Sequence, residues 1–156
     1  MQLVKDFLSE KGFTDIRVFS YQSRYSEAEY LEYLQNSKFG VWVGAHESQG
    51  FALQEALSCD VLLLVWNIRT MSDEYGSNYH PYEATTIPYW SPSCGEYFYD
   101  AKELRTTFQR FINRLEYYMP RNFVVENLAI DKCASRFKDL IELGFNVFRS
   151  IFCERL

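Results

Sequence analysis

The chain has 156 residues, of which 47% are hydrophobic and 24% charged, a balance typical of one soluble globular domain. Its formal net charge of −5 argues against a nucleic-acid backbone as the main partner, although local amides and helix dipoles can still bind a small phosphorylated ligand. The 12 Tyr and 13 Phe exceed what a domain of this size can bury, so many rings must be partly exposed or line a groove.

The first 66 residues alternate helical and strand patterns. In chain order they predict a helix over 3–10, a strand over 16–20, a helix over 27–35, a buried strand over 39–43, a helix over 47–58 and a buried strand over 61–66. Ser26 and Glu29 form a capping box at the start of the second helix. Because apolar strands alternate with helices, we expect a doubly wound α/β fold, with a parallel sheet covered on both faces.

The second half is less regular. In chain order it predicts a long polar loop over 67–84, a short strand over 85–89, a turn at Pro92 and Gly95, an amphipathic helix over 101–118 ended by Pro120, and a further amphipathic helix from Asp131 onward. We interpret residues 1–156 as a single domain. A doubly wound half-domain normally begins with a strand, so we expect a piece of a longer protein whose first strand is missing here.

Cysteine and histidine usage does not predict a metal site. None of the four cysteines forms a CxxC pair and the chain has two histidines, so reduced thiols in a cytoplasmic compartment are expected. The longest apolar run, residues 61–66, is far too short to span a bilayer, and residues 1–12 do not form a signal peptide.

The segment 44–56 joins a buried strand to a helix and predicts a ligand site. Ligands of open parallel sheets bind beyond the carboxyl ends of the strands, where the first helical turn offers N–H groups to an anion. Gly50 lets a ligand approach the backbone closely. Glu47 and Glu55 fall on one face, about 12 Å apart, if the helix starts early, which suits a nucleotide sugar with hydroxyls at both ends of a diphosphate. The alternative is that Glu47 caps the helix dipole and Glu55 lies on a solvated face.

Residues 47–59, with the sequence ESQGFALQEALSC, resemble the E-x7-E segment of retaining GT-B glycosyltransferases. Residues 18–21 and 26–31 look like the strand, loop and short helix that precede this segment in the family, and residues 95–111 and 121–127 fit its closing elements loosely. The resemblance covers most of the chain, but only residues 47–59 are specific. It implies a Rossmann-like C-terminal half that binds a UDP- or GDP-sugar, without another cofactor or a metal, for hexose transfer to an unknown acceptor.

Carried over position by position, the resemblance implies a donor-binding set of Tyr21, Glu47, Ser48, Gln49, Gly50, Phe51 and Glu55. Glu47 contacts the sugar hydroxyls as the catalytic residue, and Glu55 contacts the ribose. The amides of residues 49–51 lie beside the diphosphate, and Tyr21 and its neighbours border the base.

This sequence departs from the family pattern in several ways. Asp60 replaces the usual Gly and Leu62 a frequent Pro, so we expect that turn to differ. The basic residues that neutralise the diphosphate follow the missing first strand, and the upstream acceptor-binding domain is absent. We therefore expect this chain alone to be inactive, and membrane association through the missing parts is left open.

Other residues near the strand ends admit two interpretations each. His46 either touches the ligand or packs as a neutral ring, and Trp66 is more often a core residue than a ligand platform. A second turn, containing Tyr89, Trp90, Cys94 and Gly95, is a candidate to close over the donor. The competing functions are a non-catalytic α/β binding module with a degenerate site and, less well supported, a flavodoxin-like or receiver domain.

Overall fold

A three-stranded parallel sheet forms the centre of the computed structural model, which describes residues 1–20, 23–44, 46–76 and 78–152. Its strands are β1 (Phe39–Val43), β2 (Leu62–Trp66) and β3 (Gly95–Phe98), and they lie side by side in chain order. Val41 pairs with Leu64, which pairs in turn with Glu96. The expected parallel α/β fold is confirmed at this level, with β2 in the middle.

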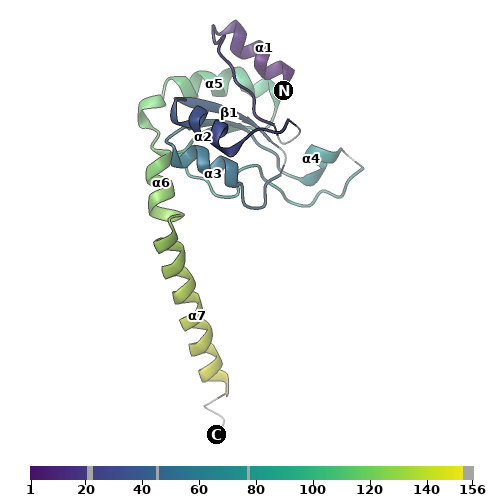
Figure 1. Cartoon of the computed structure of the whole chain (residues 1–156). Helices are drawn as coiled ribbons and strands as arrows, with labels where there is room; N and C mark the ends of the chain where they lie inside the picture. Colours follow the sequence, from purple (N-terminus) through teal and green to yellow (C-terminus); the bar gives the residue numbers. More distant parts are fainter. Residues whose placement is uncertain (21–22, 45, 77, 153–156) are drawn as a thin grey trace.

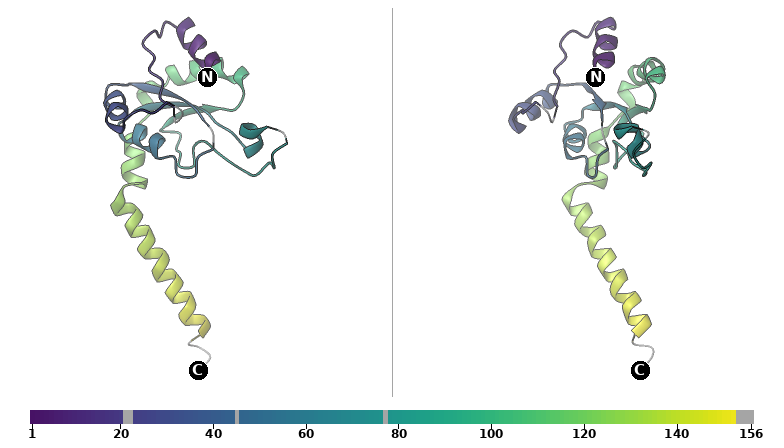
Figure 2. Two further views of the ribbon diagram at one scale, coloured as in Figure 1. Left: turned by 45° about the vertical axis from the view of Figure 1, so that its right-hand side comes forward. Right: turned by 90° about the vertical axis from the view of Figure 1, so that its right-hand side faces the viewer.

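Helices cover both faces of the sheet, because the two faces of β2 are apolar. On one face α1 (Gln2–Glu10) and α5 (Leu104–Ile112) pack over Leu62 and Leu64, and on the other α2 (Glu27–Gln35) and α3 (Phe51–Ser58) pack over Leu63 and Val65. The alternation follows from the two-residue period of a strand. Figures 1 and 2 show the resulting layers, with α2 and α5 on opposite sides of the sheet.

The strand expected over 16–20 does not form. Apart from an isolated bridge between Ser20 and Ser23, the described residues of this segment have no strand pairing. Ile16 packs against the α1–α5 core, whereas Phe19 packs against the α2–α3 core. The alternating pattern therefore reflects a chain that crosses from one face of the sheet to the other. An extended segment becomes a strand only where a neighbour completes its hydrogen bonds.

The third strand lies where the sequence suggested a turn. Residues 85–89, expected to be a strand, are irregular, because Thr86 N–H donates to the side chain of Asn67 (2.8 Å) instead of to a ladder. Gly95 begins β3 with φ +143°, and a Cβ there would lie 1.9 Å from the Leu63 carbonyl oxygen. That glycine thus marks a close approach of two backbones, not a turn.

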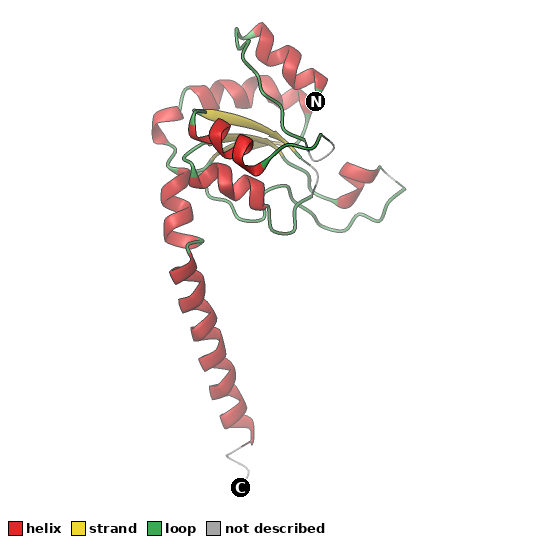
Figure 3. Ribbon diagram, viewed as in Figure 1, coloured by secondary structure: helices red, strands yellow, loops and turns green. Residues whose placement is uncertain are grey.

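The remaining helices are shorter or longer than expected. The 67–84 loop contains a short helix, α4 (Met71–Tyr75), and the helix expected over 101–118 is divided into η1 (Ala101–Glu103), α5 and η2 (Leu115–Tyr117). Pro120 begins α6 (Pro120–Asn127), where a first-turn proline loses no helical hydrogen bond. The predicted C-terminal helix is confirmed as α7 (Ile130–Phe152), which extends away from the α/β layers (Figures 1 and 3). Among the described residues, no helix is both long and apolar enough to cross a membrane.

Candidate functional site

The candidate site is the turn that joins β1 to α3 at the carboxyl edge of the sheet. The expectation that the helix begins at Glu47 is wrong, because Gly50 adopts the left-handed conformation (φ +67°) and α3 begins at Phe51. A residue with that backbone conformation lies outside the helix and serves as its N-cap. Glu47 therefore lies on the turn and Glu55 on the helix, so the separation of about 12 Å along one helix does not apply.

The predicted site residues differ in exposure. Glu47 is half-buried and Gly50 is buried, whereas Ser48, Gln49, Phe51 and Glu55 are exposed. The side-chain amide of Gln54 donates to the carbonyl of Gln49 and ties the turn to the helix. Tyr21 lies outside the described residues. These positions keep the exposed face of the turn accessible to a ligand while its inner side packs on the protein.

Tyr25 is a neighbour of Glu55 that sequence reasoning did not single out. Burial, and then the nearby carboxylate of Glu55, hold the pKa of Tyr25 above its ordinary value, so its phenol stays protonated. Tyr25 precedes α2, which is tied to α3 by the hydrogen bond from Tyr30 Oη to the Ala52 carbonyl (2.8 Å). The segment before α2 thus borders α3 at the exposed carboxylate.

Residues 85–88 pack against the inner side of the turn. Glu47 N–H donates to the carbonyl of Thr85 (2.9 Å), and a Cβ on Gly50 would lie 3.5 Å from Pro88. A Cβ on Gly44 would lie 2.0 Å from Thr86 Cγ2, so only glycine fits there. The segment expected to be a strand therefore acts as a brace for the turn that carries Glu47.

Asn67 holds that brace in place from the end of β2. Its side-chain Oδ1 accepts hydrogen bonds from Ile68 N–H (2.9 Å), Thr85 Oγ1 (3.0 Å) and Thr86 N–H (2.8 Å). Its backbone N–H donates to the carbonyl oxygen of Phe98 (2.8 Å). Sequence reasoning noted only that Asn67 follows a strand. The available signal was an amide side chain directly after a fully apolar strand, where it can be buried only with its hydrogen bonds satisfied.

Glu74 of α4 clamps His46, the residue before Glu47. Its Oε2 accepts from the His46 backbone N–H (2.8 Å) and lies 2.7 Å from the ring Nδ1. Burial acts to raise the pKa of Glu74, but the hydrogen bonds from His46 outweigh it and hold the pKa below its ordinary value. The carboxylate therefore stays ionised. An ionised acceptor requires a proton on Nδ1, so Glu74 fixes the orientation of the His46 ring. Contact of His46 with a ligand stays a prediction.

Arg69 supplies a cation at this edge, three residues after β2. Its guanidinium lies 3.7 Å from the centre of the Tyr99 ring, a cation–π contact made by an exposed side chain. Trp66 is held by the bond from its Nε1 to the Tyr99 carbonyl (3.0 Å) and belongs to the core. The sequence had suggested no basic residue for a diphosphate, and Arg69 is the candidate that the fold brings forward.

The second proposed turn is only partly placed away from the site. Cys94 and Gly95 are at the amino end of β3, on the opposite edge of the sheet from the β1–α3 turn, so the interpretation that they close over a donor is wrong. Trp90 packs against the α2–α3 core, and Tyr89 follows Pro88, the neighbour of Gly50, so a contact of Tyr89 with the donor stays a prediction. Burial raises the pKa of the Cys94 thiol, which fits a packing role. Within the described ranges, no three His, Cys, Asp or Glu side chains lie close enough to hold a metal ion.

Asp60 was expected to change the turn after α3. It adopts the left-handed conformation (φ 65°), which favours glycine, and its carboxylate accepts from the N–H of Arg121 (3.2 Å). Aspartate tolerates this conformation better than most residues. Asp60 therefore has a glycine-like backbone and adds an acidic contact to the start of α6.

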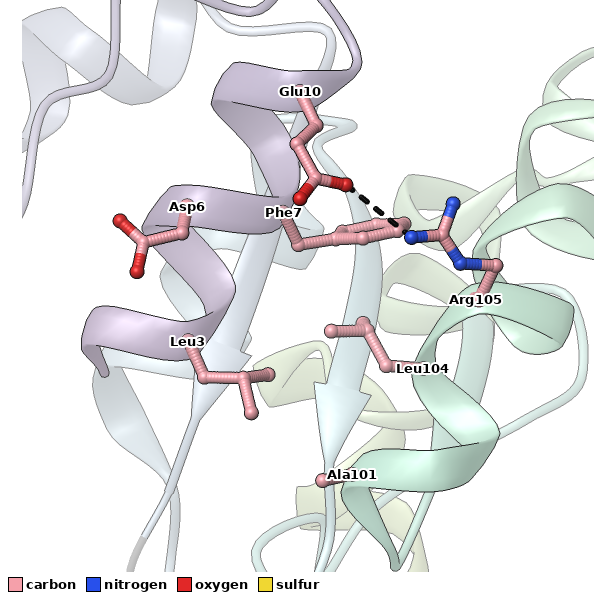
Figure 4. Close-up of a pocket in the computed structure, with 7 residues that line it drawn as sticks. All are labelled: Leu3, Asp6, Phe7, Glu10, Ala101, Leu104 and Arg105. Atoms are coloured by element: carbon pink, nitrogen blue, oxygen red, sulfur yellow. Dashed lines mark hydrogen bonds and ion pairs between the residues drawn. The ribbon is translucent and has the colours of Figure 1, made fainter.

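A separate hollow of ≈ 460 Å³ lies between α1 and the η1–α5 segment (Figure 4). Phe7 and Leu104 provide its apolar wall, and Glu10 pairs with Arg105 at one end (3.2 Å). Both partners of that ion pair are more than 60% exposed, so the pair contributes little to stability. The hollow lies on a helical face and contains none of the predicted site residues.

Comparison of the chain with protein-family models, with curated proteins and with solved structures finds no match. Its function is therefore argued from the β1–α3 turn and from the resemblance of residues 47–59 to the E-x7-E segment. Both concern the same few residues, and the fold places those residues at the sheet edge where ligands of parallel sheets bind.

Proposed function

We propose that the chain is the nucleotide-sugar-binding domain of a retaining glycosyltransferase, a Rossmann-like C-terminal half of a GT-B enzyme. The observation that carries this proposal is the turn from β1 to α3, where half-buried Glu47, left-handed Gly50 and exposed Glu55 follow one another at the carboxyl edge. The proposal also includes a first strand, outside this chain, that pairs with β1. In the described sheet β1 has a neighbour on one side only, and Phe39–Val43 carries neither charge nor proline to protect a free edge.

Each role follows from the chemistry of the group. The Glu47 carboxylate accepts hydrogen bonds from the donor sugar, and the Glu55 carboxylate accepts them from the ribose hydroxyls. The N–H groups of the first turn of α3 have no partner within the helix, and with Arg69 they offset the charge of the diphosphate. During transfer, the acceptor hydroxyl oxygen forms a bond to sugar C1 and gives up its proton to the leaving diphosphate. The bond between C1 and the diphosphate oxygen breaks, and the nucleoside diphosphate leaves with the electron pair. Groups that stabilise this charge lower the barrier.

Calorimetric titration with UDP-glucose and GDP-mannose tests donor binding. A hydrogen bond from a charged group contributes roughly 1.5–3 kcal/mol, so Glu55→Ala should weaken the bound sugar nucleotide about ten- to a hundredfold while the protein stays folded. Glu32→Ala is the matched control, because Glu32 is an exposed carboxylate on α2. If neither sugar nucleotide binds, the alternative of a non-catalytic module is correct. Equal effects of the two variants would remove Glu55 from the site.

An assay of sugar transfer tests whether this chain needs the proposed upstream domain for activity. Much of the rate of transfer comes from holding donor and acceptor together in a water-poor cleft, and the family builds that cleft between two domains. We expect no turnover by this chain alone and turnover by a longer chain with the upstream residues, on the same panel of donors and acceptors. Equal rates would show that the catalytic unit is already complete here.

A further inference from the structure

Residues 69–83, in the first half of the connection between β2 and β3, carry three tyrosines that the core does not use. The exposed fraction is 54% for Tyr75, 45% for Tyr79 and 60% for Tyr82. Single exposed apolar residues are ordinary, but several rings gathered on one short segment mark a surface built for contact. We call these three rings, together with His80, the tyrosine ledge.

The rings of the ledge form two contacting pairs. The centres of Tyr75 and Tyr79 are 5.0 Å apart with their planes tilted by 40°, and His80 stacks on Tyr82 at 4.1 Å. The His46 ring lies 6.0 Å from that of Tyr75, so the ledge continues to the residue before Glu47. Such pairs hold each ring in a defined orientation and present aromatic faces at the surface.

The two arms of the segment are joined at its base and to the candidate site. Met71 N–H donates to the Tyr82 carbonyl (2.8 Å), and Ala84 N–H donates to the Arg69 carbonyl (3.0 Å). The clamp of Glu74 on His46 then ties α4 to the β1–α3 turn. The ledge is therefore positioned relative to Glu47 by hydrogen bonds, and Figure 1 shows α4 standing apart from the helices that cover the sheet.

The chemistry of the ledge favours a neutral, hydroxyl-rich ligand. Aromatic faces carry negative charge density and attract the C–H groups on the face of a pyranose ring. Residues 70–83, which follow Arg69, contain three acidic side chains, Asp73, Glu74 and Glu83, and neither Lys nor Arg, so the ledge itself favours a neutral ligand over an anionic one.

We propose that the tyrosine ledge binds a hexose ring of a neutral oligosaccharide. The ledge is a carbohydrate-binding surface whether or not a sugar nucleotide binds at the β1–α3 turn, so the inference goes beyond the proposed function. It gives Tyr75, Tyr79, His80 and Tyr82 a binding role beside that turn.

The test uses the full chain with maltotetraose, isomaltotetraose and cellotetraose as probes, followed by saturation-transfer NMR. Loss of one stacked ring should weaken binding of the preferred tetrasaccharide about two- to tenfold, so Tyr75→Ala and Tyr79→Ala should each do so. Tyr79→Phe keeps the ring and should retain most of the affinity. Tyr117→Ala is the matched control, because Tyr117 is 73% exposed on η2, outside the ledge.

Several results would overturn the inference. They are the absence of binding of all three tetrasaccharides, equal effects of Tyr79→Ala and Tyr117→Ala, or ledge-dependent binding to phosphatidylcholine vesicles, which would make the tyrosines a membrane contact. Titration with UDP-glucose and GDP-mannose separates this inference from the proposed function. Sugar nucleotide bound without tetrasaccharide rejects the ledge alone, whereas tetrasaccharide bound without sugar nucleotide supports the ledge and rejects the donor role.

Discussion

The close contact between Gly44 and Thr86 predicts that Gly44→Ala destabilises the protein and that shortening Thr86 restores much of the lost stability. In Gly44→Ala the new Cβ would lie 2.0 Å from Thr86 Cγ2 and 3.0 Å from its Oγ1, far inside the distance of about 3.5–4.0 Å that carbon atoms prefer. Thr86 is fully buried and its backbone is held by Asn67, so the side chain has little room to move. Overpacking costs about 1–3 kcal/mol, and we expect Gly44→Ala near the upper end.

Thr86→Ala should relieve most of this cost. It removes a buried methyl, at a loss of about 0.8 kcal/mol. It also removes Oγ1, which has no hydrogen-bond partner in the part of the chain that the structure describes and whose burial costs about 1–3 kcal/mol. Alone, the change should therefore be neutral or stabilise the protein by up to about 2 kcal/mol. In its background the two Thr86 side-chain atoms nearest to the new Cβ of Gly44→Ala are gone, and Thr86 Cβ lies 3.1 Å away, which is tight but tolerable.

Urea unfolding of the four proteins, followed by tryptophan fluorescence, measures the coupling. We expect the double variant to be more stable, by about 1–2 kcal/mol, than the sum of the single effects predicts. In thermal unfolding each kcal/mol corresponds to roughly 2–4 °C. Additivity within about 0.5 kcal/mol would refute the reasoning, because it would mean that the brace formed by residues 85–88 does not press on the turn.

Three further predictions concern single residues. Gly95→Ala should destabilise the protein by about 3 kcal/mol or more, since its Cβ would lie 1.9 Å from the Leu63 carbonyl oxygen. The control Gly12→Ala, whose Cβ would have no neighbour within 4 Å, should cost only the strain of a positive φ. Equal urea midpoints for the two variants would contradict this prediction. Gly144→Ala places a Cβ in open space on α7 and should stabilise that helix by about 0.5–1 kcal/mol, seen as greater ellipticity at 222 nm, and an unchanged spectrum would show that α7 is already fully helical. Burial, and then the hydrogen bond to Glu96, raise the pKa of Tyr118, so the folded state holds the phenol proton more tightly than the unfolded state does. The free energy of unfolding should therefore be unaffected by this group below its ordinary pKa of 10.0 and should fall as the pH rises above it. Tyr118→Phe should make this fall shallower, and an equal slope in both proteins would contradict the prediction.

Local patterns were sufficient for α1, α2 and α7, for the central part of α5 and for the strands β1 and β2, but not for α4 or α6. The capping box at Ser26 predicted the start of α2, and its Oγ does accept the N–H of Glu29 (3.1 Å), although the Glu29 carboxylate pairs with Arg17 instead of returning to the cap. Continuous apolar runs predicted β1 and β2, because a strand buried on both faces needs apolar residues at every position. The short, mixed sequence of β3 (Gly95–Phe98) has no such signal.

The sequence predicted where the candidate segment lies along the chain, but not where its helix begins. Order along the chain alone put the segment 44–56 between a strand and a helix, and that is where the structure has it. Where the helix begins depended on Gly50, whose left-handed conformation moves Glu47 off the helix, and a glycine in sequence permits several conformations. The clamp of Glu74 on His46 joins residues 28 positions apart, which no local pattern encodes.

What the sequence by itself determined is the set of elements whose causes are local: amphipathic helices, apolar strands and a glycine-containing turn between β1 and α3. What only the tertiary structure decided is which segments become neighbours. Residues 16–20 and 85–89 both have sequence patterns typical of extended chain, yet neither is a strand. A strand forms only beside another strand whose backbone N–H and C=O groups are still unpaired. Asn67, Thr86 and Glu74 acquire their roles through contacts with residues distant in sequence, since a buried polar group is stable only where the fold supplies its partners.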